Sequence, residues 1–357
     1  NFQIISKNKT VLLLIVLYFY LILNSFISTN FDIGLKRNFG FIRYILIFIV
    51  INYFFFHSKS FEIIFKIWTM VFSLVFFDIF YEFFNGNNIL GFVSENSKRI
   101  VSFFKDEQVV GAFLNGFIFI LIGFLFNRFE KKTLIKKIFI FSFIIIAIVS
   151  MILTGERSNT IKFFLGLSIF FYFNDKINLK HKLSFIVLFV SLFFIFANYF
   201  FDINQKRNLI HRYYNDLVEK ITHKEKRDNL IYFKLYNSGY EIFKKNPIFG
   251  VGNKNYRVES CQKTVENQVD YICSTHPHQI YFEFLSEHGL FGTLVLLFII
   301  FYLIFKNYRR MILKKNLIQI GCFSYLLINF IPILPGGSFF ADFNATFFWL
   351  NFSIYYA

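Results

Sequence analysis

The stretch CSTHPHQIYFEFLSEHG, residues 273–289, gathers groups that can bind anions and move protons. His276 and His278 lie two positions apart, and Glu283 and Glu287 follow before the next apolar run. The ordinary pKa of histidine lies closest to neutral pH, so its imidazole can accept a proton from a hydroxyl group. The stretch is therefore a candidate site for acid–base chemistry.

A helix is expected to begin inside this stretch. Pro277 suits the first helical position, Ser274–His276 can supply the cap, and Gly289 suits the position just past the helix end. His278 would then lie in the first turn, where free N–H groups attract phosphate and the helix dipole keeps an imidazole uncharged. Glu287 would lie in the last turn against the dipole, which indicates a functional or paired carboxylate.

Of the two histidines we favour His278 as the general base, and we assign His276 to the cap. The alternative is that His278 is itself a surface or capping residue. Glu283 or Glu287 would orient a partner of the base.

Two cysteines in the same polar region, Cys261 and Cys273, are expected to form a disulfide. Closing so short a loop would stabilise the fold by roughly 3 kcal/mol. The alternative is a metal site built with His276 and His278, but their spacing is compressed for zinc, and a His-Pro-His triplet is expected to point its rings apart. Cys322 lies in an apolar run and is expected to be buried.

Arginines supply candidate anion ligands. Arg157 lies in the turn TGERSNT (154–160), beside apolar runs where a charge is costly unless it is paired or functional. Arg257 follows GVGNKNY (250–256), whose Gly250 and Gly252 predict a tight turn. The alternatives are lipid-headgroup contact for Arg157 and a plain turn after Pro247 for the glycines. Further basic candidates, for which solvation is the alternative, are Arg207, Arg212 and Arg227. Asp106 and Glu107 could hold a metal only if their diverging side chains met.

The elements that position these residues are membrane helices. The 357 residues are 56% hydrophobic, with 59 Phe and only 4 Pro, whereas soluble chains average about 45–50% apolar residues. We therefore expect an all-α polytopic membrane protein of about ten or more transmembrane helices, and part of a longer chain. The candidate spans are 10–29, 41–56, 61–80, 110–127, 137–153, 158–174, 182–201, 289–306, 316–334 and 344–357.

Charge predicts the topology. The net charge of +16 lies in particular loops, so it does not indicate nucleic acid. Lys and Arg gather around 128–137, 176–182 and 306–315, which are expected to be cytoplasmic. The expected organisation is an N-terminal bundle (1–201), an extracytoplasmic, mostly helical loop domain (202–288) and C-terminal helices (289–357).

The chain resembles the O-antigen ligase and polymerase family of bacterial envelope glycosyltransferases. The residues that carry the resemblance are NPIFGVGNKNYR (246–257), Cys261, CSTHPHQIYFEFLSEHGLFG (273–292), TGERSNT (154–160) and SFFKDEQVVG (102–111). Two positions depart from the family pattern: Gln279 stands where Asn is usual, and Tyr232 lies about where many members have Arg.

This resemblance implies glycan transfer from undecaprenyl diphosphate to an acceptor hydroxyl, such as lipid A core, without a metal or other cofactor. It implies a bacterial inner membrane protein with its catalytic loop in the periplasm. His278 would be the base, with Arg157, Arg257 and Arg212 candidates for the pyrophosphate. Alternatives are a polymerase of the same family, a lipid-linked oligosaccharide transporter and a non-catalytic envelope scaffold.

Overall fold

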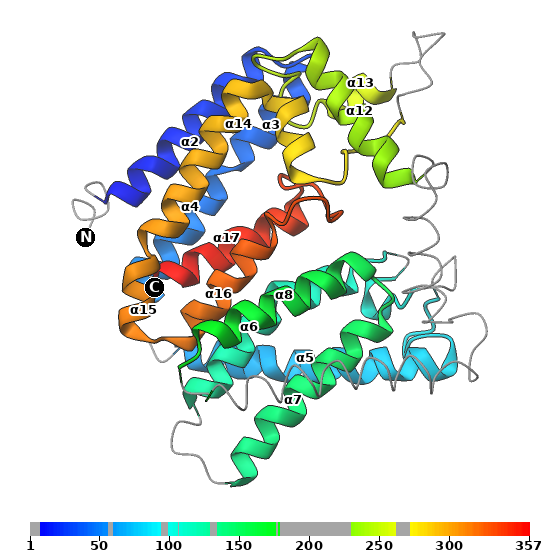
Figure 1. Ribbon diagram of the computed structural model, residues 1–357, viewed down its shortest axis with the longest axis vertical. Helices are drawn as coiled ribbons and strands as arrows, with labels where there is room; N and C mark the ends of the chain where they lie inside the picture. Colours follow the sequence, from blue (N-terminus) through cyan, green and yellow to red (C-terminus); the bar gives the residue numbers. More distant parts are fainter. Residues whose placement is uncertain are drawn as a thin grey trace. The chain divides into compact units, whose positions relative to one another are not determined.

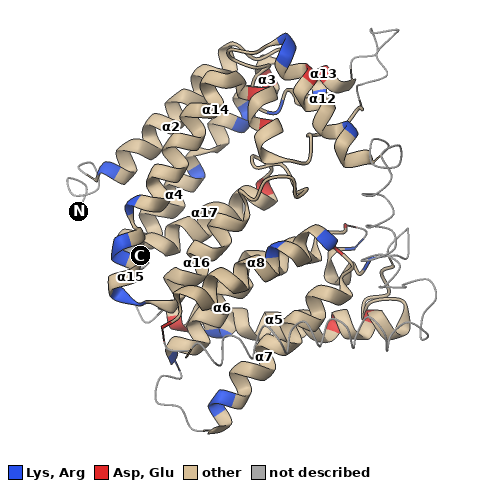
Figure 2. Ribbon diagram, viewed as in Figure 1, with Lys and Arg blue, Asp and Glu red and all other residues tan. Residues whose placement is uncertain are grey.

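The computed structural model describes residues 8–55, 60–93, 99–105, 107–128, 134–175, 178, 230–261 and 272–357. Within these ranges all regular secondary structure is helical, so the expected all-α class is confirmed there. The chain divides into two compact units. Figure 2 shows long helices that are largely free of charge along their length, with Lys, Arg, Asp and Glu mostly toward their ends.

Several helices are long and apolar enough to cross a membrane, which makes this a multi-pass membrane protein. In the described part of the chain there are five, Lys9–Phe26, Phe61–Asn85, Val110–Arg128, Leu134–Leu153 and Ile280–Lys314, and Leu317–Ile328 is a shorter apolar helix. The expected spans at 41–56, 158–174 and 344–357 also contain helices, but these are shorter than 18 residues. The expected span at 182–201 lies outside the described residues, and a total of ten crossings stays a prediction.

The first unit combines Asn1–Phe56, Lys220–Arg309 and Phe330–Ala357. Within it α12 packs on α14, α2 packs on α3 and α14, and α4 packs on α17 (Figure 1). Leucines at helical spacing on α2 face this interior, whereas the intervening positions are more exposed. Its helices are α2 (Lys9–Phe26), α3 (Phe31–Gly40), α4 (Ile42–Ile49) continued by the π-helix η1 (Val50–Phe55), α12 (Ile231–Lys245), α13 (Tyr256–Cys261), α14 (Ile280–Lys306) and α17 (Asp342–Tyr356).

A buried network of amides joins the corner between α2 and α3 to the Gly-rich turn. The Asn38 side chain donates to the carbonyl oxygen of Leu21 (2.6 Å) and to the hydroxyl of Ser25 (2.9 Å). Asn253 donates through Nδ2 to Oδ1 of Asn38 (2.5 Å) and through its backbone N–H to Oδ1 of Asn24 (2.8 Å). The three asparagines are almost fully buried. The N-terminal helices therefore fix the turn that precedes α13.

The second unit combines His57–Glu219 and Arg310–Asn329. Its central helix is α6, which packs against α5, α7, α8 and α16. In Figure 1 the other described helices of this unit lie around α6. They are α5 (Ser60–Asn85), the short 3₁₀ helix η2 (Ser102–Phe104), α6 (Val110–Arg128), α7 (Leu134–Leu153), α8 (Arg157–Phe173) and α16 (Leu317–Ile328), and α15 (Tyr308–Lys314) leads into α16.

Two glycines allow α6 and α16 to touch through their backbones. A Cβ atom on Gly321 would lie 2.2 Å from the carbonyl oxygen of Phe119, and one on Gly123 would lie 2.3 Å from that of Leu317. Real Cβ atoms do not come so close to backbone oxygens, so no larger residue fits without moving a helix. Small residues of this kind are what close packing of membrane helices requires.

Gly321→Ala should therefore lower stability by about 1–3 kcal/mol, because the added methyl group overpacks the contact. Helix propensity alone would predict the opposite result, a gain in stability of roughly 0.5–1 kcal/mol on replacing Gly by Ala. Thermal unfolding in detergent measures the effect. The matched control is Gly40→Ala in α3, where nothing lies within 4 Å of the new methyl group. A midpoint for Gly321→Ala equal to that of Gly40→Ala would contradict the prediction.

Candidate active site

The segment that carries the two histidines leads directly into α14, but the helix begins later than expected. Its first residue is Ile280 and its cap is Gln279, whose side-chain oxygen accepts from the N–H groups of Tyr281 (2.8 Å) and Phe282 (3.1 Å). The expectation that Pro277 opens the helix was wrong. His278 is therefore outside the first turn.

The reason is the backbone of His278. Its φ of 57° lies in the left-handed region, which cannot begin a right-handed helix and which few residues other than glycine adopt. The N–H of Gly336 donates to the His278 carbonyl oxygen at 2.8 Å and holds this conformation. The expected cap at Ser274–His276 was also wrong, because the Ser274 hydroxyl donates to the carbonyl oxygen of His276 (3.2 Å) instead.

The two imidazoles lie close together, with their planes tilted by 39°. The ring centroids of His276 and His278 are 3.9 Å apart, so the expectation that they diverge was wrong. The ring of Tyr232 on α12 also contacts His278, with ring centroids 5.9 Å apart in an edge-on arrangement. Both histidines are half-buried. Residue 232, one of the two positions that depart from the family pattern, is thus a direct neighbour of the candidate base.

Burial keeps both imidazoles uncharged. It lowers the pKa of His278 by more than a backbone hydrogen bond with Gly336 raises it. The pKa of His276 is lowered to about 3, mainly by burial and to a smaller extent by the nearby His278, Lys254 and Arg257. A neutral His278 was expected, but from the dipole of a helix that does not contain it. The cause is desolvation.

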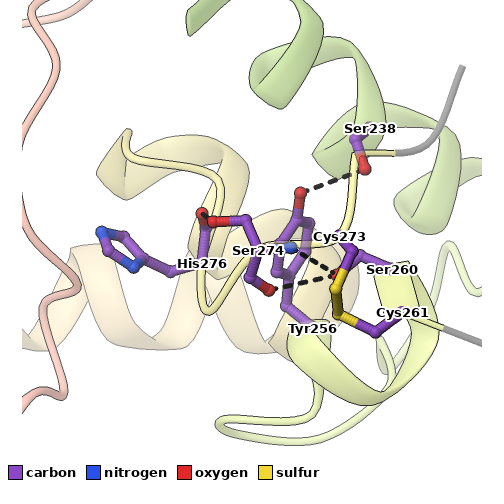
Figure 3. Close-up of a disulfide and its surroundings, with 7 residues drawn as sticks. All are labelled: Ser238, Tyr256, Ser260, Cys261, Cys273, Ser274 and His276. Carbon is purple, nitrogen blue, oxygen red and sulfur yellow. Dashed lines mark hydrogen bonds between the residues drawn. A yellow bond between two sulfur atoms is a disulfide. The ribbon is translucent and has the colours of Figure 1, made fainter. Parts of the chain in front are cut away.

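The disulfide between Cys261 and Cys273 is confirmed. Figure 3 shows it at the end of α13, where the Ser260 hydroxyl donates to the carbonyl oxygen of Ser274 (3.1 Å) and ties the two segments a second time. In the same view the His276 ring points away from the two sulfur atoms. Sulfurs bonded to each other are not thiolate ligands, so the alternative site built from these cysteines and histidines does not form.

The Gly-rich turn supports a break in α14 rather than facing a ligand. Gly289 interrupts the helix with φ 63° and ψ −171°, as expected for a residue that ends one helix before the apolar run. The N–H groups of Val251 and Gly252 donate to the carbonyl oxygens of Ser286 (3.0 Å) and Glu287 (2.8 Å). A Cβ on Gly250 would lie 2.5 Å from the backbone of Glu287, so only glycine fits there.

Beneath this turn lies a buried group of charges. Glu283 and Glu287 are fully buried, and Lys254 is 4% exposed. Glu287 accepts from the backbone N–H of Tyr256 at 3.3 Å. Lys254 interacts electrostatically with both glutamate side chains, and its ammonium donates to the hydroxyl of Ser338 at 2.6 Å. Both glutamates thus act on protein groups here, and catalysis by Glu287 stays a prediction.

Lys254 was not identified from the sequence as a buried residue, because a lysine in a polar turn is usually solvated. His288 was missed as well. It is fully buried, and its Nδ1 lies 3.1 Å from the Tyr20 hydroxyl. The only sequence signal for Lys254 and His288 was that each lies within one of the two stretches that carry the family resemblance, 246–257 and 273–292.

The candidate anion ligands fall into separate parts of the chain. Arg257 is the second residue of α13, is exposed, and lies close enough to His276 to affect its pKa. Arg157 is the first residue of α8 in the second unit and is half-buried. Arg207, Arg212 and Arg227 lie outside the described residues, as does Asp106, while Glu107 is exposed.

The turn that carries Arg157 is anchored by a carboxylate. Glu156 is 5% exposed and accepts from the N–H of Gly111 (2.7 Å) and from the Asn159 side chain (2.6 Å). Ile100 donates through its N–H to the carbonyl oxygen of Thr154 at 3.3 Å. Two elements of the resemblance, at 102–111 and 154–160, therefore touch each other.

Comparison with known families fits this geometry. Residues 141–297 match the family described as O-antigen ligase. Over this part of its sequence the chain is similar to O-antigen ligases. The match includes Arg157, the Gly-rich turn, the disulfide and the two adjacent histidines. No curated protein and no solved structure matched the chain. Among the described residues, inside the matched region and outside it, no three His, Cys, Asp or Glu side chains gather as metal ligands would.

The disulfide should stabilise the folded protein by roughly 3 kcal/mol, because the cross-link reduces the conformational entropy of the unfolded chain. Reducing agent should therefore lower the thermal midpoint of the wild-type protein. The double variant Cys261→Ala/Cys273→Ala should start at the lower midpoint and show no response. Cys322→Ala, which removes the buried free thiol, is the control and should respond as wild type does. A wild-type midpoint that ignores the reductant while both thiols become labelled would refute a stabilising role.

Proposed function

We propose that this chain is a membrane glycosyltransferase that moves a glycan from undecaprenyl diphosphate to an acceptor hydroxyl, with lipid A core as the acceptor. The family match supports transfer of a lipid-linked glycan. The observation that carries the proposal is the uncharged, half-buried imidazole of His278, held in a left-handed backbone conformation at the entry of a long apolar helix.

His278 acts as the general base. Its imidazole takes the proton of the acceptor hydroxyl as the oxygen attacks the anomeric carbon of the donor sugar. The bond between that carbon and the diphosphate oxygen breaks, and undecaprenyl diphosphate leaves with the electron pair. A base in this position contributes about 10²–10⁴-fold to the rate.

The leaving diphosphate needs positive charge. Arg257 is exposed and close to the histidine pair, and guanidinium groups bind phosphate oxygens through two parallel hydrogen bonds. Arg157 and Arg212 are the further candidates for this role. Charge placed in advance at a developing anion is usually the largest catalytic contribution. Arginines supply it here, so we propose transfer without a metal.

The disulfide supports a location in an oxidising compartment. We therefore place the loop domain (202–288) in the periplasm and the helices in the bacterial inner membrane. A polymerase of the same family would use the same base and the same donor, and would differ only in its acceptor.

His278→Ala should lower transfer by about 10²–10⁴-fold, because no base then removes the acceptor proton. The measurement is glycan transfer by the purified protein in vesicles that contain the lipid-linked donor. Tyr240→Ala, an exposed residue of α12, is the control for handling and folding. Wild-type transfer by His278→Ala at normal expression would sink the assignment.

Complementation of a bacterial strain that lacks the activity distinguishes the acceptors. For a ligase, the empty strain shows no glycan on lipid A core, and the chain restores it. If the strain lacks only the polymerase and shows single-repeat caps that the chain extends, the polymerase is the correct alternative.

The lowered pKa of His278 predicts a shifted pH profile. A base with a lowered pKa stays deprotonated in more acidic solution, so transfer should persist below pH about 6.5, the ordinary value for histidine, and fall only further down. Tyr232→Ala should expose the ring and move this acidic limb upward, whereas Tyr240→Ala should leave it in place. An acidic limb at pH 6.5 or above in the wild type would contradict the desolvated base.

A further inference from the structure

A non-helical segment far along the chain holds the candidate base. Residues 330–341, here named the strap, precede α17 and form three hydrogen bonds, with α12, with α14 and with the segment just before α14. The hydroxyls of Tyr281 and Tyr236 donate to the carbonyl oxygens of Phe330 (2.7 Å) and Ile333 (2.9 Å). The third bond joins the N–H of Gly336 to the carbonyl oxygen of His278 at 2.8 Å.

A buried polar node secures the strap two residues beyond Gly336. The hydroxyl of Ser338 donates to Glu283 at 2.5 Å and accepts from the ammonium of Lys254 at 2.6 Å. The backbone N–H of Phe339 donates to the other carboxylate oxygen of Glu283 at 2.9 Å. Glu283 is fully buried and Ser338 is 1% exposed, so water does not compete for these bonds.

The node and the base are joined by a short, continuous path. Lys254 and Glu283 fix Ser338, and Ser338 fixes the backbone that presents the N–H of Gly336. That N–H holds the carbonyl of His278, whose left-handed φ is unfavourable for a residue with a side chain. If the strap moved, the peptide between His278 and the helix cap could turn, and the imidazole would point elsewhere.

We propose that Lys254 and Ser338 are positioning residues for glycan transfer, which act through the strap to hold His278 in its left-handed conformation. This inference rests on the proposed function of His278 as the base. Lys254 itself is not a phosphate ligand, because its ammonium lies in the protein interior at 4% exposure and binds Ser338.

The variants Ser338→Ala and Lys254→Met test the proposal by steady-state transfer with both donor and acceptor varied. A misplaced base should lower kcat by roughly 10²-fold and leave both KM values unchanged. Ser338→Thr, which keeps the hydroxyl, should restore most of the rate. Ser353→Ala and Lys306→Met are matched controls in the same unit, since each removes a hydrogen bond in which no strap residue takes part. The controls should keep the wild-type kcat.

A double-mutant cycle separates positioning from general damage. Because both residues act through one path, Lys254→Met combined with Ser338→Ala should lose no more than either single variant. Adding Ser338→Ala to His278→Ala should not lower the residual rate further. Losses that multiply in either combination would overturn the proposal, as would a raised donor KM with an unchanged kcat, which would make Lys254 a substrate ligand.

Hydrogen exchange at the Gly336 amide gives a readout that needs no activity. It should accelerate in Ser338→Ala and remain slow in Ser353→Ala, and equal protection in the two would overturn the proposal. Failure of the proposed function is distinguishable: His278→Ala would then retain its rate. If His278→Ala is inactive while Ser338→Ala keeps the wild-type kcat, only the positioning role fails.

Discussion

The first unit depends on an exchange of backbone hydrogen bonds at the break in α14. Where Gly289 interrupts the helix, the carbonyls of Ser286 and Glu287 lose their helical partners and accept from Val251 and Gly252. In return, the N–H groups of Leu290 and Phe291 donate to the carbonyls of Pro247 and Ile248. In an apolar surrounding an unpaired backbone group costs several kcal/mol, so the helix can break only where another turn takes up these bonds. This exchange fixes the turn that carries Lys254 and leads into α13, both of which lie near His276.

Buried carboxylates hold backbone segments in both units. Glu82 accepts from the N–H of Ser102 at 2.7 Å, and Asp78 accepts from the Ser102 hydroxyl at 2.5 Å. Glu156 and Glu283 do the same for Gly111 and for Phe339. Charge-assisted bonds of this kind are stronger than neutral ones, and they fix loops that have no regular secondary structure. These four acids thus shape the loops at helix ends.

Local pattern explains what could be predicted from the sequence. Long apolar runs require helices, because a membrane leaves the backbone no other partner, and two cysteines twelve positions apart suit a short cross-link. The identity of the histidine motif was also visible, since it depends on neighbours in sequence. The geometry of the motif could not be predicted, because the left-handed φ of His278 depends on a hydrogen bond with Gly336, 58 positions away. Because of this φ the helix begins later and Gln279 is its cap. The strap escaped notice for the same reason, as its role depends on Tyr236, Glu283 and Lys254.

The asparagine network at the corner of α2 and α3 has an electrical consequence. Asn24, Asn38 and Asn253 are buried among apolar residues, yet none of them carries or can acquire a net charge. A transmembrane voltage exerts its force on net charge, at about 2.3 kcal/mol per elementary charge for 100 mV. The geometry of this contact between the N-terminal helices and the turn that carries Lys254 should therefore depend neither on the membrane voltage nor on pH. A single charged side chain in its place would have made the geometry of the site sensitive to the membrane voltage.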